Sequence, residues 1–226
     1  MKHAAMVCIL VLLWMTGCAS QPRRVVSPPP AISTTAAIPA PAGQFQPDAN
    51  LYLCPNATIT NALESDSRNR VLNFNPVVLV DGKVVMTPVP VNNACLTSGF
   101  GRRFGRTHKG LDLKASPPEM VYAAAPGIIR EATTSTGFGN HVVIDHGQGV
   151  FTRYGHLDRF APGVWEGASI GFGQPLGVMG QTGNATGIHL HFEVLTGNYN
   201  TPKKSFGLTA RNPLSFPAYT GQASGY

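Results

Sequence analysis

The sequence is poor in charged residues, and it has neither a long apolar run nor a dense basic segment. Charged residues make up 12% of the 226 residues, about half of the usual share. The apolar run Ala4–Met15 is shorter than the about 20 residues that a membrane-spanning helix needs. The net charge of +6 is spread along the chain, so nucleic-acid binding is not indicated. Glycine (25) and proline (19) are abundant instead, which favours strands and turns over a helical bundle.

Residues 1–17 have the pattern of a lipoprotein signal peptide. A positively charged start precedes the apolar run, and a Met-Thr-Gly-Cys segment ends at Cys18. This segment resembles the bacterial lipobox, in which the cysteine is lipidated and becomes the new N-terminus. The resemblance implies an exported lipoprotein held in a membrane by its lipid, and Ala19 and Ser20 after the cysteine point to the outer membrane, facing the periplasm. The alternative is an ordinary secretory signal with Cys18 unmodified.

Residues 18–47 are rich in proline and have few large apolar side chains. Such a segment cannot bury enough surface to offset its ordering entropy, so we expect a tether between the membrane and a folded domain. Its length in an extended polyproline form corresponds to a reach of roughly 90 Å.

A small N-terminal unit is expected over residues 48–96. Two β-branched runs flank Asp81-Gly82, which predicts a hairpin over residues 76–86. Cys54 and Cys95 lie at the two ends of this unit, and in an exported protein we expect them to form a disulfide; the alternative is two unrelated thiols. Their spacing does not fit a metal site.

The histidines carry the chemical information, because six of the seven lie between positions 108 and 191. In Ile-His-Leu-His-Phe-Glu-Val, His189, His191 and Glu193 alternate with apolar residues, which predicts a strand with one polar face. Two imidazoles on one face can serve one small site, one binding a metal and the other handling a proton. Glu193 is either a support for a ligand or a structural residue.

His108 and Asp112 lie four residues apart, too far apart on a straight strand to bind one ion. We expect the chain to bend at Gly110. A histidine and an aspartate joined by one more histidine provide three nitrogen and oxygen ligands, the open arrangement of a catalytic zinc site. His141 and His146 flank an apolar strand and are interpreted as structural or surface residues.

These motifs together resemble the lysostaphin-type metallopeptidases, the M23 or LytM family of peptidoglycan endopeptidases. The resemblance covers about residues 97–195 and rests on five segments: Ser98-Gly99-Phe100-Gly101-Arg102, the His108/Asp112 pair, Tyr154-Gly155-His156-Leu157, Thr182-Gly183 with Thr186-Gly187, and His189-Leu190-His191-Phe192-Glu193. It implies that one Zn²⁺ is bound by His108, Asp112 and His191. It also implies that His156 and His189 are the catalytic histidines, with Arg102, Tyr154 and Thr186 near the substrate groove.

The resemblance also implies the fold, a mainly antiparallel β-sheet core of the LytM, duplicated-hybrid-motif type over residues 97–218, followed by a tail over 219–226. Short apolar runs separated by glycine and proline agree with it. We expect strands at residues 120–125, 127–134, 140–146, 149–156 and 188–195.

The function implied is hydrolysis of peptide cross-links in peptidoglycan, with peptide stems as substrate and zinc-bound water as nucleophile. Two alternatives stay open. One is a non-catalytic lipoprotein that binds cell wall or activates another wall hydrolase, and the other is an autoinhibited form in which residues before Thr97 block the site. The bond that is cut, between D-alanine and a diamino acid or within a glycine bridge, is not indicated by the motifs.

Overall fold

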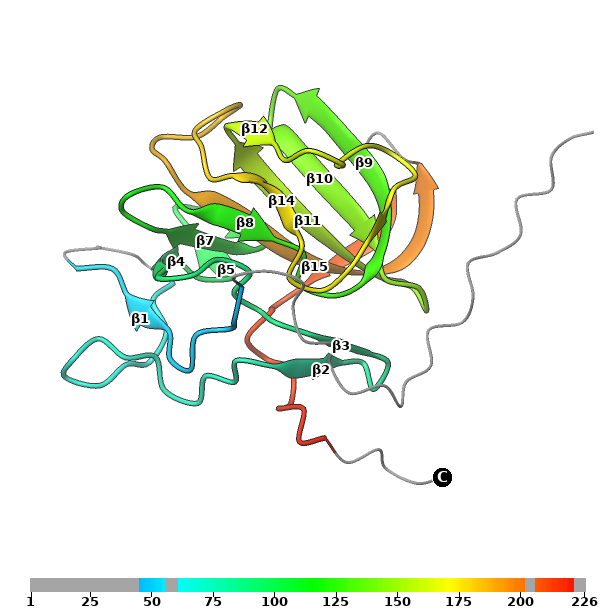
Figure 1. Cartoon of the computed structure of the whole chain (residues 1–226). Coiled ribbons are helices and arrows are strands. Elements are labelled where there is room, and N and C mark those ends of the chain that lie inside the picture. Colours follow the sequence, from blue (N-terminus) through cyan, green and yellow to red (C-terminus); the bar gives the residue numbers. More distant parts are fainter. Residues whose placement is uncertain (1–44, 56–60, 202–205, 222–226) are drawn as a thin grey trace, which may run out of the picture. The chain divides into compact units, whose positions relative to one another are not determined.

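The structure is a computed structural model that describes residues 45–55, 61–201 and 206–221 (Figure 1). All described residues belong to one compact unit of the chain, within Ala31–Tyr226. The predicted signal peptide, Cys18 and nearly all of the tether therefore lie outside the described residues. Within the described part there are strands and turns without helices, and so no helix there is able to cross a membrane.

The predicted mainly antiparallel β fold is confirmed. The strands of the described residues are β1 (Tyr52–Leu53), β2 (Val78–Val80), β3 (Val84–Met86), β4 (Cys95–Ser98), β5 (Gly101–Arg103), β6 (Arg106–His108), β7 (Leu111–Lys114), β8 (Met120–Tyr122), β9 (Gly127–Ser135), β10 (Gly139–Asp145), β11 (Val150–Leu157), β12 (Arg159–Phe160), β13 (Ser169–Ile170), β14 (Pro175–Val178), β15 (Leu190–Thr201) and β16 (Phe206–Arg211).

The largest sheet is organised around β15, which pairs with β7, β11 and β16. Among the described residues this sheet has nine strands, in the order β1-β4-β7-β15-β11-β10-β9-β13 with β16 beside β15. All its pairs are antiparallel except β1 with β4. Because β7 and β11 flank β15, three segments that are distant in the sequence lie side by side (Figure 1).

The alternation of side chains along β11 and β15 separates two faces of the sheet. Tyr154 lies opposite Phe192, and both rings are fully buried in the main apolar core. The small sheet β12-β14-β8 contributes Val121 and Leu176 to the same core. The other face of β15 carries His191 and Glu193, which are also buried. The predicted polar face of this strand is therefore enclosed, and its polar groups need partners within the protein.

A strand pair and a disulfide attach the region before residue 97 to the sheet. β1 pairs with β4, and a disulfide joins Cys54 to Cys95 at the start of β4. The predicted hairpin is present as β2 and β3, with a tight turn at Asp81–Lys83. Since β4 pairs with β7 in turn, this region supports the strand that carries Asp112.

Candidate metal and catalytic site

Strand pairing brings Asp112 and His191 together. They lie directly opposite each other on β7 and β15, so their side chains leave the sheet on the same face. The distance from His191 Nδ1 to Asp112 Oδ1 is 2.9 Å. Both side chains are buried. A pair that is 79 residues apart in the sequence is thus fixed by sheet register alone.

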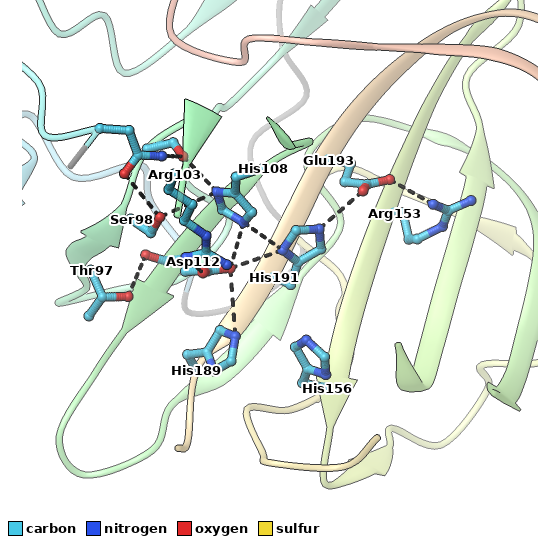
Figure 2. Close-up of polar contacts among 12 residues, drawn as sticks. Thr97, Ser98, Arg103, His108, Asp112, Arg153, His156, His189, His191 and Glu193 are labelled. Atoms are coloured by element: carbon cyan, nitrogen blue, oxygen red, sulfur yellow. Dashed lines mark hydrogen bonds and ion pairs between the residues drawn. The ribbon is translucent and has the colours of Figure 1, made fainter. Parts of the chain in front are cut away.

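His108 reaches the same point from the end of β6. Its Nε2 lies 3.0 Å from Asp112 Oδ1 and 3.1 Å from His191 Nδ1 (Figure 2). The chain turns between β6 and β7 next to Gly110, as the sequence predicts. Glycine is needed here because the backbone passes close to β15, and a Cβ at this position would collide with the carbonyl oxygen of Phe192.

The hydrogen-bond partners determine which ring nitrogens carry protons. His108 Nδ1 lies 2.6 Å from the carbonyl oxygen of Gly99, which can only accept a hydrogen bond, so the proton is on Nδ1. His191 Nε2 lies 3.1 Å from the carboxylate of Glu193, so its proton is on Nε2. In the neutral rings, the lone pairs of His108 Nε2 and His191 Nδ1 therefore point at Asp112 Oδ1. In this state three hydrogen-bond acceptor atoms converge with no donor hydrogen between them. A cation can bind in such a position.

The electrostatics of the site favour a positive charge between these groups. Burial raises the pKa of Asp112, but hydrogen bonds and charges from His108 and His191 outweigh it and hold that pKa far below its usual value. Burial lowers the pKa of His191, but Asp112 and Glu193 outweigh it and raise that pKa to about 9. The site thus attracts a proton when no metal is bound, and a metal ion can take the place of that proton. The ligand atoms of His108, Asp112 and His191 lie within 4.8 Å of one another, as a group that could hold a metal ion.

Glu193 and Arg153 continue the site into the protein. Glu193 accepts the proton of His191 with one oxygen, and its other oxygen lies 2.7 Å from Arg153 Nη1. Both side chains are buried, and the guanidinium also lies 4.4 Å from the centre of the Phe138 ring. Of the two roles left open for Glu193 by the sequence, this contact favours support of a ligand, since such partners fix the tautomer of a metal-binding histidine.

His156 approaches the ligands from the end of β11. It lies within a register shift between β10 and β11, and its φ of 65° is in the left-handed region, which non-glycine residues rarely adopt. Its Nδ1 donates to the carbonyl oxygen of Thr182 over 2.8 Å. Burial is the main cause that lowers the pKa of His156 to about 4. The ring is therefore neutral at pH 7, with the lone pair on Nε2.

His189 lies beside His156, and their ring centres are 4.8 Å apart. Its Nδ1 lies 2.8 Å from the carbonyl oxygen of Gly187, which again places the proton on Nδ1. The Nε2 atom is 3.6 Å from Asp112 Oδ1. His189 and His156 thus each direct an unprotonated nitrogen toward the region of the three ligand atoms (Figure 2).

The three residues expected at a substrate groove have different positions. Thr186 lines a groove next to Asp112. Tyr154 is wholly buried on the opposite face of the sheet, where its hydroxyl accepts a hydrogen bond from Ala124 N and contacts Thr152. It is therefore a core residue and does not line the groove. Arg102 is exposed, and its neighbour Arg103 makes the contact with the site.

Three residues that contact the site are not predicted from the sequence: Arg103, Arg153 and Asn61. Arg103 Nη1 donates to Asp112 Oδ2 over 2.7 Å. The Asn61 side-chain amide donates to the same Gly99 carbonyl that His108 contacts. Adjacent side chains on β5 point to opposite faces of the strand, so only one of Arg102 and Arg103 can face the site. No local pattern in the sequence marks Asn61 or Arg153.

The two histidines interpreted as structural have structural partners. His141 Nε2 lies 2.9 Å from Glu131. His146 contacts the carbonyl oxygen of Pro126 and the hydroxyl of Thr152 at 2.7 and 2.8 Å. Neither belongs to the group of three ligand atoms.

Comparison with known proteins gives matches to peptidases. The chain is 37% identical over 124 residues to DD-carboxypeptidase/endopeptidase Mpg of Neisseria meningitidis, covering 50% of this chain and 28% of that protein. It is 36% identical over 88 residues to peptidoglycan DD-endopeptidase ShyA of Vibrio cholerae, covering 39% of this chain and 20% of that protein. The chain thus spans less than a third of the length of these relatives.

A solved structure of a zinc-containing peptidase from Vibrio cholerae has a similar fold. Its TM-score is 0.51 at 26% identity, covering 63% of this chain and 47% of that one. Residues 106–202 match the profile described as Peptidase family M23, and this segment contains every histidine of the site. The resemblance seen in the sequence is confirmed for this segment: residues 106–202 carry a match to peptidase family M23.

Proposed function

We propose that this protein is a zinc-dependent endopeptidase that hydrolyses peptide cross-links of peptidoglycan. The observation that carries the proposal is the convergence of three ligand atoms, from His108, Asp112 and His191, beside two further imidazoles. Two histidines and a carboxylate are typical ligands of a catalytic zinc. The name of the Vibrio relative supports peptidoglycan as substrate.

The spacing of the ligand atoms suits zinc. Ligands at about 2.0–2.1 Å from a tetrahedral zinc lie roughly 3.3 Å apart, and the three distances between the ligand atoms here are 2.9, 3.0 and 3.1 Å. Three protein ligands leave a position for water. When bound in this way, zinc lowers the pKa of its water to about 7 and polarises a carbonyl.

We assign the proton transfers to His156 and His189. The Nδ1 proton of each ring is held by a backbone carbonyl, so Nε2 is free to accept a proton from water and return it to the leaving amine. The low pKa of His156 keeps its lone pair available near neutral pH. Arg103 holds the outer oxygen of Asp112, and Glu193 holds the outer nitrogen of His191, so both ligands keep their orientation.

The decisive experiment is digestion of purified cross-linked sacculi with and without a chelator. We expect release of uncross-linked peptides that stops on chelation and returns with Zn²⁺. His156→Ala and His189→Ala should each lower the rate by about 10²–10⁴ while one zinc per chain is retained. Asp112→Ala should lose the zinc, and Lys83→Gln, on the β2–β3 turn, should behave as wild type. An active, zinc-free preparation would contradict the proposal.

We also propose that the protein is exported and anchored by a lipid on Cys18 in the outer membrane, facing the periplasm. The support is the signal pattern and Met-Thr-Gly-Cys motif of residues 1–18, followed by a proline-rich segment that connects to the folded residues. We keep 48–96 and 97–218 as the proposed boundaries of the small unit and the peptidase domain. Incorporation of labelled fatty acid into the wild type, and its absence in Cys18→Ser, tests the anchor.

A further inference from the structure

A groove of about 290 Å³ lies beside the ligand atoms, between the start of β15 and the strands β4 and β7. It is lined by Thr97, Arg103, Asp112, Lys114, Thr186, Gly187, Ile188 and His189. Because Asp112 and His189 are in its wall, a peptide bound at the site would place a neighbouring group in this groove.

The charge of the groove is positive. Lys114 and Arg103 supply two cationic groups, and among the described residues that line the groove Asp112 is the only acidic one. Asp112 is already engaged, with Oδ1 facing the two histidine ligands and Oδ2 held by Arg103. The described lining of the groove therefore has more cationic than anionic side chains.

Lys114 is the group best placed to meet a ligand. It lies two residues beyond Asp112 on β7, so its side chain leaves the sheet on the same face as that carboxylate. Lys114 is exposed, and no acidic side chain of the described residues forms an ion pair with it. Its three N–H donors are open to solvent or to a substrate.

Arg103 adds donors of fixed geometry. Its side chain is 33% exposed, and one guanidinium nitrogen is committed to Asp112. A guanidinium has five N–H donors, so several can reach a second anionic group. Ile188, at the edge of the same groove, is 42% exposed and offers an apolar contact to an aliphatic side chain.

We propose that this groove is a carboxylate subsite, in which Lys114, helped by Arg103, binds a free carboxylate on the residue next to the amide that is cut. This inference rests on the proposed function and specifies its substrate. The preferred cross-link is then one whose diamino acid bears a carboxylate on the carbon that carries the acylated amine. A glycine bridge has no carboxylate there, and neither does a cross-link through a simple aminoalkyl side chain.

Two synthetic cross-linked peptides test the proposal. Both have a D-alanyl amide to a diamino dicarboxylic acid; one has the free carboxylate beside that amide, and the other has a carboxamide of the same shape. We expect the wild type to cleave the carboxylate form about 10- to 100-fold more efficiently in kcat/KM, the range of a charge-assisted hydrogen bond. This preference should weaken with added salt, since partly exposed charges are screened.

The variants separate the subsite from the rest of the site. Lys114→Gln should reduce the preference to threefold or less, mainly by slowing cleavage of the carboxylate form, with the zinc content unchanged. Lys114→Arg should retain most of the preference, and Lys83→Gln, a matched lysine change away from the groove, should retain all of it.

The outcomes are distinguishable. A wild type that cleaves both peptides equally well, or a Lys114→Gln variant with an undiminished preference, overturns the carboxylate subsite and leaves the endopeptidase proposal standing. A wild type that cleaves neither peptide and no sacculi overturns the proposed function itself.

Discussion

The Glu193 carboxylate lies 3.1 Å from His191 Nε2, two residues away on the same strand. This contact turns His191 Nδ1, the other ring nitrogen, toward Asp112. Glu193→Gln keeps an acceptor for His191 but leaves the buried Arg153 without its carboxylate. We expect zinc affinity to fall about 10- to 100-fold.

Competition with a chelator of known affinity measures this change. Glu166→Gln, an exposed glutamate in the loop before β13, is the matched control and should bind zinc as the wild type does. Equal affinities for Glu193→Gln and the control would show that the charge of Glu193 and its pairing with Arg153 do not contribute to zinc binding.

The close approach of Gly110 to the Phe192 carbonyl predicts that a larger residue at this position disturbs the metal site. A Cβ there would overlap the Phe192 carbonyl, so Gly110→Ala must push β7 away from β15 and separate Asp112 from His191. We expect loss of zinc binding and a lowered melting temperature. Gly137→Ala is the control, because a Cβ at that turn meets nothing within 4 Å. Zinc binding by Gly110→Ala at the control's affinity would contradict this explanation.

The sequence identifies the central chemistry and misses its supports, for a physical reason. Four site residues lie in two short motifs, and the spacing within each motif does not depend on strand register: His108, Asp112, His189 and His191. Arg103 reaches Asp112 over nine residues, whereas Asn61 reaches Gly99 over 38 and Arg153 reaches Glu193 over 40. These contacts depend on strand register and on how a separate region packs, which no local pattern encodes.

Strand prediction succeeds where alternation and glycine breaks coincide, as in β9, β10 and β11. It is less accurate at β15, which begins at Leu190 and continues to Thr201, because the residues after Val194 no longer alternate between apolar and polar. The buried polar face of this strand was also not foreseeable, since a polar side chain in the sequence gives no sign of its burial.

Asn61 allows a test of whether the N-terminal unit inhibits or supports the enzyme. Its amide donates to the Gly99 carbonyl behind His108, and among the described residues the groove is lined only by positions 97–189. We therefore expect Asn61→Ala to lower zinc affinity severalfold, through a less fixed His108, with Asn50→Ala as the exposed control. An increase in sacculus hydrolysis, from Asn61→Ala or from removal of the residues before Thr97, would favour autoinhibition instead.

The Cys54–Cys95 disulfide should contribute to stability and little to chemistry. It closes a loop of 41 positions, which corresponds to at most about 4 kcal/mol by chain entropy. The double variant Cys54→Ser/Cys95→Ser should lower the free energy of unfolding by about 2–4 kcal/mol, measured by urea denaturation. Because β4 still pairs with β7, zinc affinity should change less than threefold. A large loss of affinity at unchanged stability would reverse this assignment.

His146 predicts how stability depends on pH. Its ring is buried between Pro126 and Thr152, and burial lowers its pKa from 6.5 to about 4. Between these values the unfolded chain binds a proton that the folded chain does not, so stability falls as the pH is lowered. The expected loss from this residue is about 2 kcal/mol between pH 7.5 and 5. His156, with a similarly lowered pKa, adds a loss of the same sign.

Urea denaturation of wild type and His146→Gln, both in chelator so that metal release does not contribute, separates the two histidines. The variant should be less stable at pH 7.5, because the packed ring is lost, but its stability should decline less steeply toward pH 5. The difference in slope corresponds to the proton that His146 takes up on unfolding. Parallel pH profiles for the two proteins would mean that His146 binds as many protons in the folded as in the unfolded chain, so that burial between Pro126 and Thr152 does not lower its pKa.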